Sequence, residues 1–95
     1  MIKYLLLLIL ISTNTFASDK LEDCKATGYL AEQIMLARQE GVAISTLYEI
    51  AEQYEGMQAI VDIAYTSPLY ASEYKQKQIA GDFRDTYVRA CMSKE

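Results

Sequence analysis

The stretch STLYEIAEQYEGMQAIVDIAYTSP, residues 45–68, contains Gly56, on which the number of helices depends. Apolar side chains recur along it at alternating intervals of three and four residues, the spacing of one face of an α-helix; they are Leu47, Ile50, Tyr54, Met57, Val61 and Ala64. Ser45 is a candidate N-cap. Periodicity alone allows one continuous helix or two short ones, because a glycine costs a helix interior about 1 kcal/mol and permits a turn.

The segment before this stretch carries a second helical pattern. Asp19 and Glu22 have the spacing of a capping box, and Gly41 is a typical C-terminal stop. We therefore expect a helix over 19–40. The small residues Gly28 and Ala31 lie on its apolar face, where they would let another helix approach closely.

The segment after the stretch predicts a long last helix. Ser67 is a candidate N-cap, and Pro68 would occupy the first helical position, which tolerates proline. The expected helix covers 68–93. Its apolar face is clearest in the second half, where it comprises Ile79, Ala80, Phe83, Tyr87, Val88 and Cys91. Gly81 is a second position at which a helix could break.

The two cysteines determine the direction of the outer helices. Cys24 and Cys91 allow only one pairing. Three helices running up, down and up would leave these residues about 30 Å apart at a rise of 1.5 Å per residue, whereas a disulfide needs Cα atoms within about 7 Å. We therefore predict an all-α, four-helix domain with helices near 19–40, 46–55, 57–66 and 68–93. Two long antiparallel outer helices would be joined by the disulfide, with a short helical hairpin packed against them.

The N-terminus has the features of a secretory signal peptide. Met1–Lys3 carries one positive charge, Tyr4–Ile11 is an uninterrupted apolar run, and Thr15-Phe16-Ala17 has small residues at the first and third positions. The run is shorter than the roughly 20 apolar residues that span a bilayer. We expect cleavage after Ala17, a periplasmic or secreted domain over residues 18–95, and no stable membrane anchor afterwards.

Charge and composition exclude several function classes. The net charge is −4, and from Gln39 to Tyr74 the chain has no Lys or Arg but six acids: Glu40, Glu49, Glu52, Glu55, Asp62 and Glu73. Nucleic-acid binding needs a basic surface, so none is expected. The acidic segment is interpreted as a solvated face, with a basic partner as the alternative.

Catalytic and metal-binding patterns are also missing from the sequence. It contains no His, which removes Ser-His and Cys-His nucleophilic systems and most zinc sites. Glu49, Glu52 and Glu55 lack the glycine-turned loop of a calcium site. We therefore expect no enzyme activity, no cofactor, no metal and no catalytic residue.

Tyrosine is the one unusually frequent aromatic residue, with eight Tyr against two Phe and no Trp. Tyr65, Tyr70 and Tyr74 cluster around the Ser67-Pro68 turn and are the candidate partner-binding residues, because Tyr is enriched at protein interfaces. The alternative is that these rings cover a small core and leave their hydroxyl groups in water.

Two motifs carry a resemblance to a family. The sequence Ile34-Met35-Leu36-Ala37-Arg38-Gln39 followed by Gly41, and Ala64-Tyr65-x-x-Pro68-x-Tyr70, stand between an early Cys and a late Cys. Together with the signal peptide, they resemble an uncharacterised family of short exported bacterial two-cysteine helical proteins. In architecture alone, the chain is also similar to the periplasmic acid-stress chaperones of enteric bacteria.

These observations lead to two functional hypotheses. The first is a non-enzymatic module that binds another exported protein through its surface. The alternative is an acid-activated periplasmic chaperone, because the protonation of 13 acids at low pH would make the chain strongly positive. The sequence does not indicate the oligomeric state.

Overall fold

The computed structural model describes the backbone of residues 2–94 and the side chains of residues 19–94. Within those residues the chain is entirely helical and forms no strand. The helices are α1 (Ile2–Gln39), α2 (Ile44–Ala51), α3 (Met57–Ala64) and α4 (Glu73–Ser93). The predicted all-α, four-helix class is therefore confirmed.

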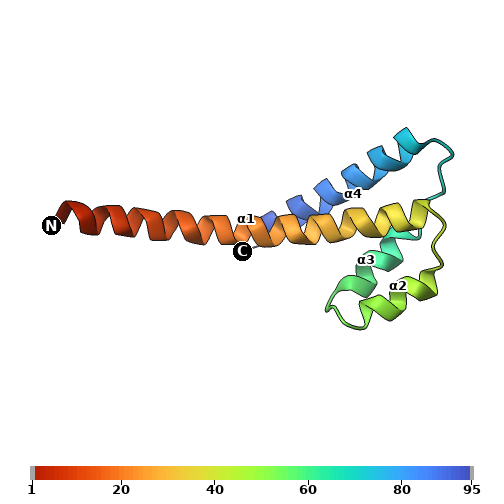
Figure 1. Cartoon of the computed structure of the whole chain (residues 1–95), viewed down its shortest axis with the longest axis horizontal. Coiled ribbons are helices and arrows are strands. Elements are labelled where there is room, and N and C mark those ends of the chain that lie inside the picture. Colours follow the sequence, from red (N-terminus) through yellow and green to blue (C-terminus); the bar gives the residue numbers. More distant parts are fainter. Residues whose placement is uncertain (1, 95) are drawn as a thin grey trace.

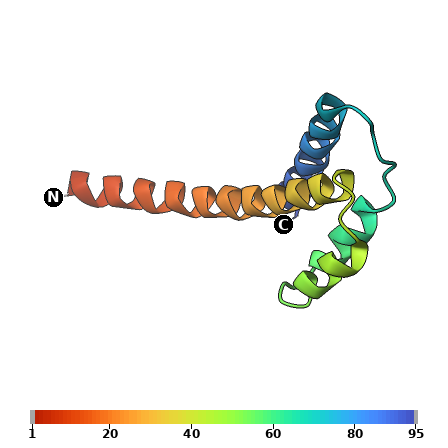
Figure 2. The ribbon, with the colours of Figure 1, turned by 45° about the vertical axis from the view of Figure 1, so that its right-hand side comes forward.

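The helices are arranged around the C-terminal half of α1. Figure 1 shows α4 running back along this half of α1, with α2 and α3 on its other side. The hairpin packs on α1 mainly through α3, and α2 packs on α3. The turned view in Figure 2 shows the N-terminal part of α1 extending beyond all three other helices.

The predicted disulfide joins the two long helices. Cys24 and Cys91 are bonded with their Cα atoms 5.5 Å apart. The antiparallel course of α1 and α4 that this bond demanded is present. Gly28, one helical turn after Cys24, packs directly against α4. A Cβ atom built at Gly28 would collide with the side chain of Val88 and lie 3.2 Å from the carbonyl oxygen of Arg84. The expectation of a close helix approach at Gly28 is confirmed.

One apolar core links all four helices. Its buried members come from both halves of the hairpin as well as from the long helices, and they are Ala31, Ile34, Met35, Leu47, Ala51, Met57, Ile60, Val61, Ala64 and Ala80. Phe83 and Tyr87 pack against this cluster from α4 and close it. The core therefore fixes how the hairpin is held against α1.

The middle segment breaks at Gly56, which supplies the extra chain reversal that the disulfide argument required. Gly56 has a φ of 83°, a left-handed conformation that glycine adopts without strain. Gly81, the other candidate break, lies inside α4. The structure also corrects part of the predicted apolar face. Tyr54 is 55% exposed, because the helical phase does not continue through residues 52–56. Ile50 is 43% exposed, because α2 buries Leu47 and Ala51 instead.

The first two helices begin at other residues than the sequence suggested. The expected start near residue 19 is wrong, since α1 begins at Ile2 and Asp19 and Glu22 lie within it. Leucine and isoleucine in the apolar run are adequate helix formers, so the helix continues through them. The α2 N-cap is Ala43 and not Ser45. No helix in the part of the chain that the structure describes is both long and apolar enough to cross a membrane.

The start of the last helix is also corrected. Pro68 lies in the connection between α3 and α4, and the N-cap of α4 is Ser72, whose side chain accepts a hydrogen bond from Lys75 N at 3.0 Å. The backbone around Pro68 bonds to side chains of α1, as described below. These tertiary bonds replace the helical ones that a start at residue 68 would have formed. Gly41, by contrast, ends α1 as predicted, with a φ of 84°.

Candidate functional site

A groove of about 350 Å³ lies next to the disulfide, between α1, the start of α3 and the end of α4. We call it the disulfide groove. Its lining is mainly apolar and comes from three helices that are distant in sequence; the apolar residues are Leu30, Ala59, Ile60, Tyr87, Ala90 and Cys91. Because these helices are joined by the core and by the Cys24–Cys91 bond, the fold defines the shape of the groove.

Small side chains keep the groove open. Ala59 on α3 and Ala90 on α4 line it and are exposed, whereas Leu30 and Ile60 are more buried in its floor. The turn at Gly56 forms the hairpin side. A larger residue at either alanine position would occupy the opening without entering the buried core.

A few polar groups surround this apolar lining. Glu55 comes from the turn before α3, and Lys94 follows the end of α4. The backbone oxygen of Lys94 accepts a hydrogen bond from Lys20 Nζ at 2.8 Å, which ties the end of the chain to α1. The groove lining therefore has one acidic residue from the hairpin, Glu55, and one basic residue just after the end of α4, Lys94.

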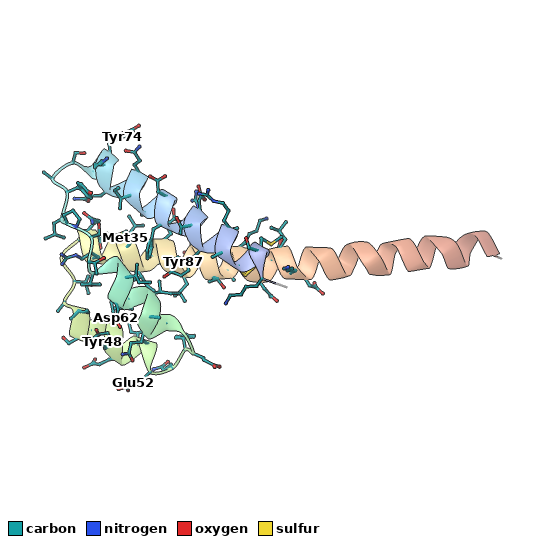
Figure 3. The ribbon with its side chains drawn as sticks, turned by 180° about the vertical axis from the view of Figure 1, so that it is seen from behind. Met35, Tyr48, Glu52, Asp62, Tyr74 and Tyr87 are labelled. Carbon is teal, nitrogen blue, oxygen red and sulfur yellow. A yellow bond between two sulfur atoms is a disulfide. The ribbon has the colours of Figure 1, made fainter. Side chains whose placement is uncertain are left out.

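Tyr87 is the aromatic side chain of the groove. Figure 3 shows it on the side of α4 that faces α1 and the hairpin. Its ring meets Phe83 edge to face with centroids 5.0 Å apart. Burial raises the pKa of Tyr87, so its hydroxyl remains protonated and able to donate a hydrogen bond at neutral pH.

The hairpin carries an exposed acidic surface beside the groove. Among residues 19–94, the carboxylates of Glu49, Glu52, Glu55 and Asp62 form no ion pair. The Tyr48 hydroxyl donates a hydrogen bond to Asp62, and this bond is the main cause that raises the pKa of Tyr48. Figure 3 shows this pair on the hairpin, with Glu52 at its outer end.

The three candidate tyrosines have different surroundings. The Tyr65 hydroxyl donates to Val42 O at 2.6 Å, and the Arg38 guanidinium lies 5.1 Å from the ring centroid. Burial raises the pKa of Tyr65, and the charge of Arg38 opposes that rise. Tyr70 is half-buried, with Lys75 Nζ 5.5 Å from its ring centroid. Tyr74 is 80% exposed and points outward from the start of α4 (Figure 3).

Two residues at the end of α1 hold the connection between α3 and α4. Arg38 Nε donates to Ser67 O at 3.1 Å. Gln39 Nε2 donates to Pro68 O at 2.9 Å, and Gln39 Oε1 accepts from Tyr70 N at 2.8 Å. The two sequence motifs that carried the family resemblance are thus in direct contact. Sequence reasoning assigned no role to Gln39, because a single polar residue at a helix end has no periodic signal.

Among residues 19–94, one ion pair crosses between the long helices. Arg84 Nη1 on α4 lies 3.0 Å from Glu32 Oε2 on α1, and the Glu32 side chain is only 22% exposed. The neighbouring Asp85 carboxylate also bonds Arg84 and is the main cause that raises the pKa of Arg84. No group of three or more metal-ligating side chains gathers within the described residues. The arrangement as a whole offers surfaces for binding.

Comparisons with known proteins give no match, whether the chain is compared with protein-family models, with curated proteins or with solved structures.

Proposed function

We propose that the chain is an exported, non-enzymatic module that binds another exported protein through the disulfide groove. The observation that carries this proposal is the groove itself: about 350 Å³ of mostly apolar lining, contributed by three helices and left open by two exposed alanines. Apolar hollows with a few surrounding polar groups are where binding sites are usually found. The pattern of the N-terminal 17 residues supports export.

The size and the supports of the groove favour a protein partner. A volume of about 350 Å³ is at the low end of the roughly 300–1,000 Å³ of small-molecule pockets, and it suits one or two apolar side chains of a partner segment. The disulfide and the core hold its walls in place before binding. Such preorganisation reduces the ordering cost that a flexible surface pays on association.

The tyrosines around residue 68 remain part of this proposal. Tyr74 presents most of its ring to solvent and is the one best placed to meet a partner directly. Tyr65 is tied by its hydroxyl bond to Val42 O, so its substitution would affect folding as well as binding. Tyr70 bonds Gln39 through its backbone amide, which a side-chain substitution leaves in place.

The experiment that tests the proposed function is affinity capture from the exported fraction of the source cells. Tagged wild-type protein is compared with Ala59→Trp, which fills the groove, with Tyr74→Ala, and with Ala26→Trp, an equally large change at an exposed α1 position outside the groove. We expect one protein to co-purify with the wild type and with Ala26→Trp and to be lost with Ala59→Trp. Capture of the same proteins by all variants would contradict a role for the groove.

Two observations favour the acid-activated chaperone as a second candidate. Arg84–Glu32 is the one ion pair between α1 and α4 among residues 19–94, and such a pair needs an ionised carboxylate. Full protonation of the acids would also change the net charge of residues 18–95 from −5 to +8. The disulfide would keep α1 and α4 together while the hairpin separates and exposes its apolar face. A client-aggregation assay at about pH 2–3 tests this, and an absence of protection would exclude it.

A further inference from the structure

We infer that the partner presents an amphipathic segment with an apolar anchor for the disulfide groove, a basic residue for Glu55 and an acidic residue for Lys94. This inference rests on the proposed function and specifies the chemistry of the partner. It follows from the identity of the groove lining and from the opposite charges at its edge. Each of these two features restricts a different part of the segment.

The lining determines the anchor. Leu30 and Ile60 supply branched aliphatic surface, Cys91 contributes its half-cystine, and the Tyr87 ring supplies aromatic surface. An apolar side chain seated there removes this surface from water and gains about 25 cal/mol for each Å² that it buries. Among apolar residues, the aromatic side chains of Trp and Tyr are the most frequent anchors at protein interfaces. The affinity of the segment is therefore expected to come from its apolar residue.

The negative charge at the hairpin side of the groove favours a basic residue in the partner segment. Glu55 lines the groove, and it belongs to a stretch from Gln39 to Tyr74 that contains no Lys or Arg. Its neighbours Glu49 and Glu52 also lack ion-pair partners among residues 19–94. A partner acid next to these carboxylates would be repelled, and a partner base would be attracted.

The positive charge near the end of α4 favours an acidic residue in the partner segment. Lys94 lines the groove, and the ammonium group of Lys20 lies 2.8 Å from the Lys94 backbone oxygen. Lys94 is the basic residue of the lining, and Lys20, which is not part of the lining, holds the Lys94 backbone against α1. An acidic residue in the bound segment would complement Lys94. A segment with its base and its acid exchanged would meet like charge at both ends, so the two charges also set its orientation.

The charges are expected to contribute specificity more than affinity. Exposed ion pairs contribute about 0.2–1 kcal/mol and are screened by salt, whereas complementary charge mainly steers association and suppresses wrong orientations. Reversal of one charge should then change affinity about 2- to 5-fold. Filling the groove should reduce affinity by about 10-fold or more.

The probe for the test is a library of random 12-residue peptides displayed on phage. The library is panned on protein expressed from the full chain, on Ala59→Trp and Ala90→Trp as two separate groove-filled variants, and on Ala26→Trp as the matched control. Both groove positions are exposed, so these variants should fold, and circular dichroism verifies this. We expect an enriched motif with a large apolar residue flanked by a base and an acid, and we expect it to be lost on both groove-filled variants and kept on Ala26→Trp.

Charge reversal tests the second half of the inference. Panning on Glu55→Lys should enrich peptides with an acidic residue where the motif had a basic one. Panning on Lys94→Glu should enrich peptides with a basic residue where the motif had an acidic one. Enriched peptides without charge preference would overturn the charge assignment. Enrichment that survives in the groove-filled variants, or no enrichment, would overturn the inference. The affinity capture distinguishes this inference from the proposed function. If the panning gives one of these contrary results but a protein still co-purifies with the wild type and not with Ala59→Trp, the proposed function stands and only the partner chemistry is refuted.

Discussion

Gln39 and Tyr70, 31 residues apart in the chain, are joined by a hydrogen bond of 2.8 Å from the Tyr70 amide to the Gln39 side-chain oxygen. The same glutamine donates to Pro68 O at 2.9 Å and is only 6% exposed. One side chain thus satisfies both a donor and an acceptor of an irregular segment. This pair of bonds explains why α4 starts at Glu73 and why the segment before it follows the end of α1.

Replacing Gln39 by Ala should release this segment. The Tyr70 amide and Pro68 O, both part-buried, would lose their bonds to Gln39, and a typical hydrogen bond contributes about 0.5–1.5 kcal/mol. We expect a lower free energy of unfolding in urea and a faster hydrogen exchange of the Tyr70 amide. The control is Gln33→Ala, at an exposed position of the same helix, which should change stability by less than about 0.5 kcal/mol. Unchanged exchange at Tyr70 would show that Gln39 does not hold the segment.

Gly28 and Gly81 should respond oppositely to substitution by Ala. Both lie in helices, where Ala is favoured over Gly by about 1 kcal/mol. At Gly28 the added Cβ meets Val88 and the Arg84 backbone, and overpacking typically costs about 1–3 kcal/mol, whereas at Gly81 the nearest atom is 3.7 Å away. Urea unfolding should therefore show Gly28→Ala destabilised and Gly81→Ala stabilised. Stabilisation by both changes would contradict the close approach of α1 and α4.

Loss of the disulfide should strongly lower the melting temperature. The bond closes a loop between residues 67 positions apart, and such a crosslink contributes about 4 kcal/mol on the chain-entropy model. In a domain of this size that corresponds to a shift of roughly 15–30 °C. Thermal unfolding by circular dichroism, with and without reductant, measures it. The Cys24→Ala/Cys91→Ala double variant is the control, since reductant should leave its melting temperature unchanged. A shift of less than about 5 °C in the wild type would refute a main role for the bond in stability.

Stability should fall in alkali, in part because of Tyr65. Burial raises the pKa of Tyr65 above its ordinary value of 10.0, so the folded state favours the neutral hydroxyl. The resulting stabilisation is complete below the unfolded pKa and is lost as pH rises through the higher folded pKa. Tyr65→Phe should cost about 0.5–1.5 kcal/mol at pH 7 through the lost bond to Val42. Its urea midpoint should decline less steeply above pH 10 than that of the wild type, and equal slopes would contradict this assignment.

Much of the fold could be inferred from the sequence because the helical period and one covalent constraint act together. The spacing of apolar residues located the helices, and the Cys24–Cys91 pairing required an odd number of chain reversals, for which Gly56 and Gly81 were the candidate breaks. The same spacing misplaced Tyr54, since a period followed across a turn loses its phase, and it misplaced Ile50, since α2 buries Leu47 and Ala51 instead. It also misplaced the start of α4, because the bonds from Arg38 and Gln39 to residues 67–70 are tertiary.

The candidate site was less accessible from the sequence. The groove combines Leu30, Ala59 and Ala90 from three helices, and no local pattern brings such residues together. The acidic hairpin was recognised as a charged segment, but only the fold shows that Glu55 lies at the groove. Among the candidate tyrosines, the sequence could not separate the half-buried Tyr65, bonded to Val42, from the exposed Tyr74.

Site-specific photo-crosslinking tests the central claim, that the disulfide groove contacts another protein, most directly. A short aliphatic amino acid that carries a diazirine, and is much smaller than the tryptophan used to fill the groove, replaces Ala90 in the groove or Ala26 outside it, and the full chain is expressed and irradiated in the source cells. The account predicts a discrete adduct of higher mass from position 90 and none from position 26. Equal labelling at the two positions, or no adduct at position 90 while the protein remains folded and exported, would contradict it.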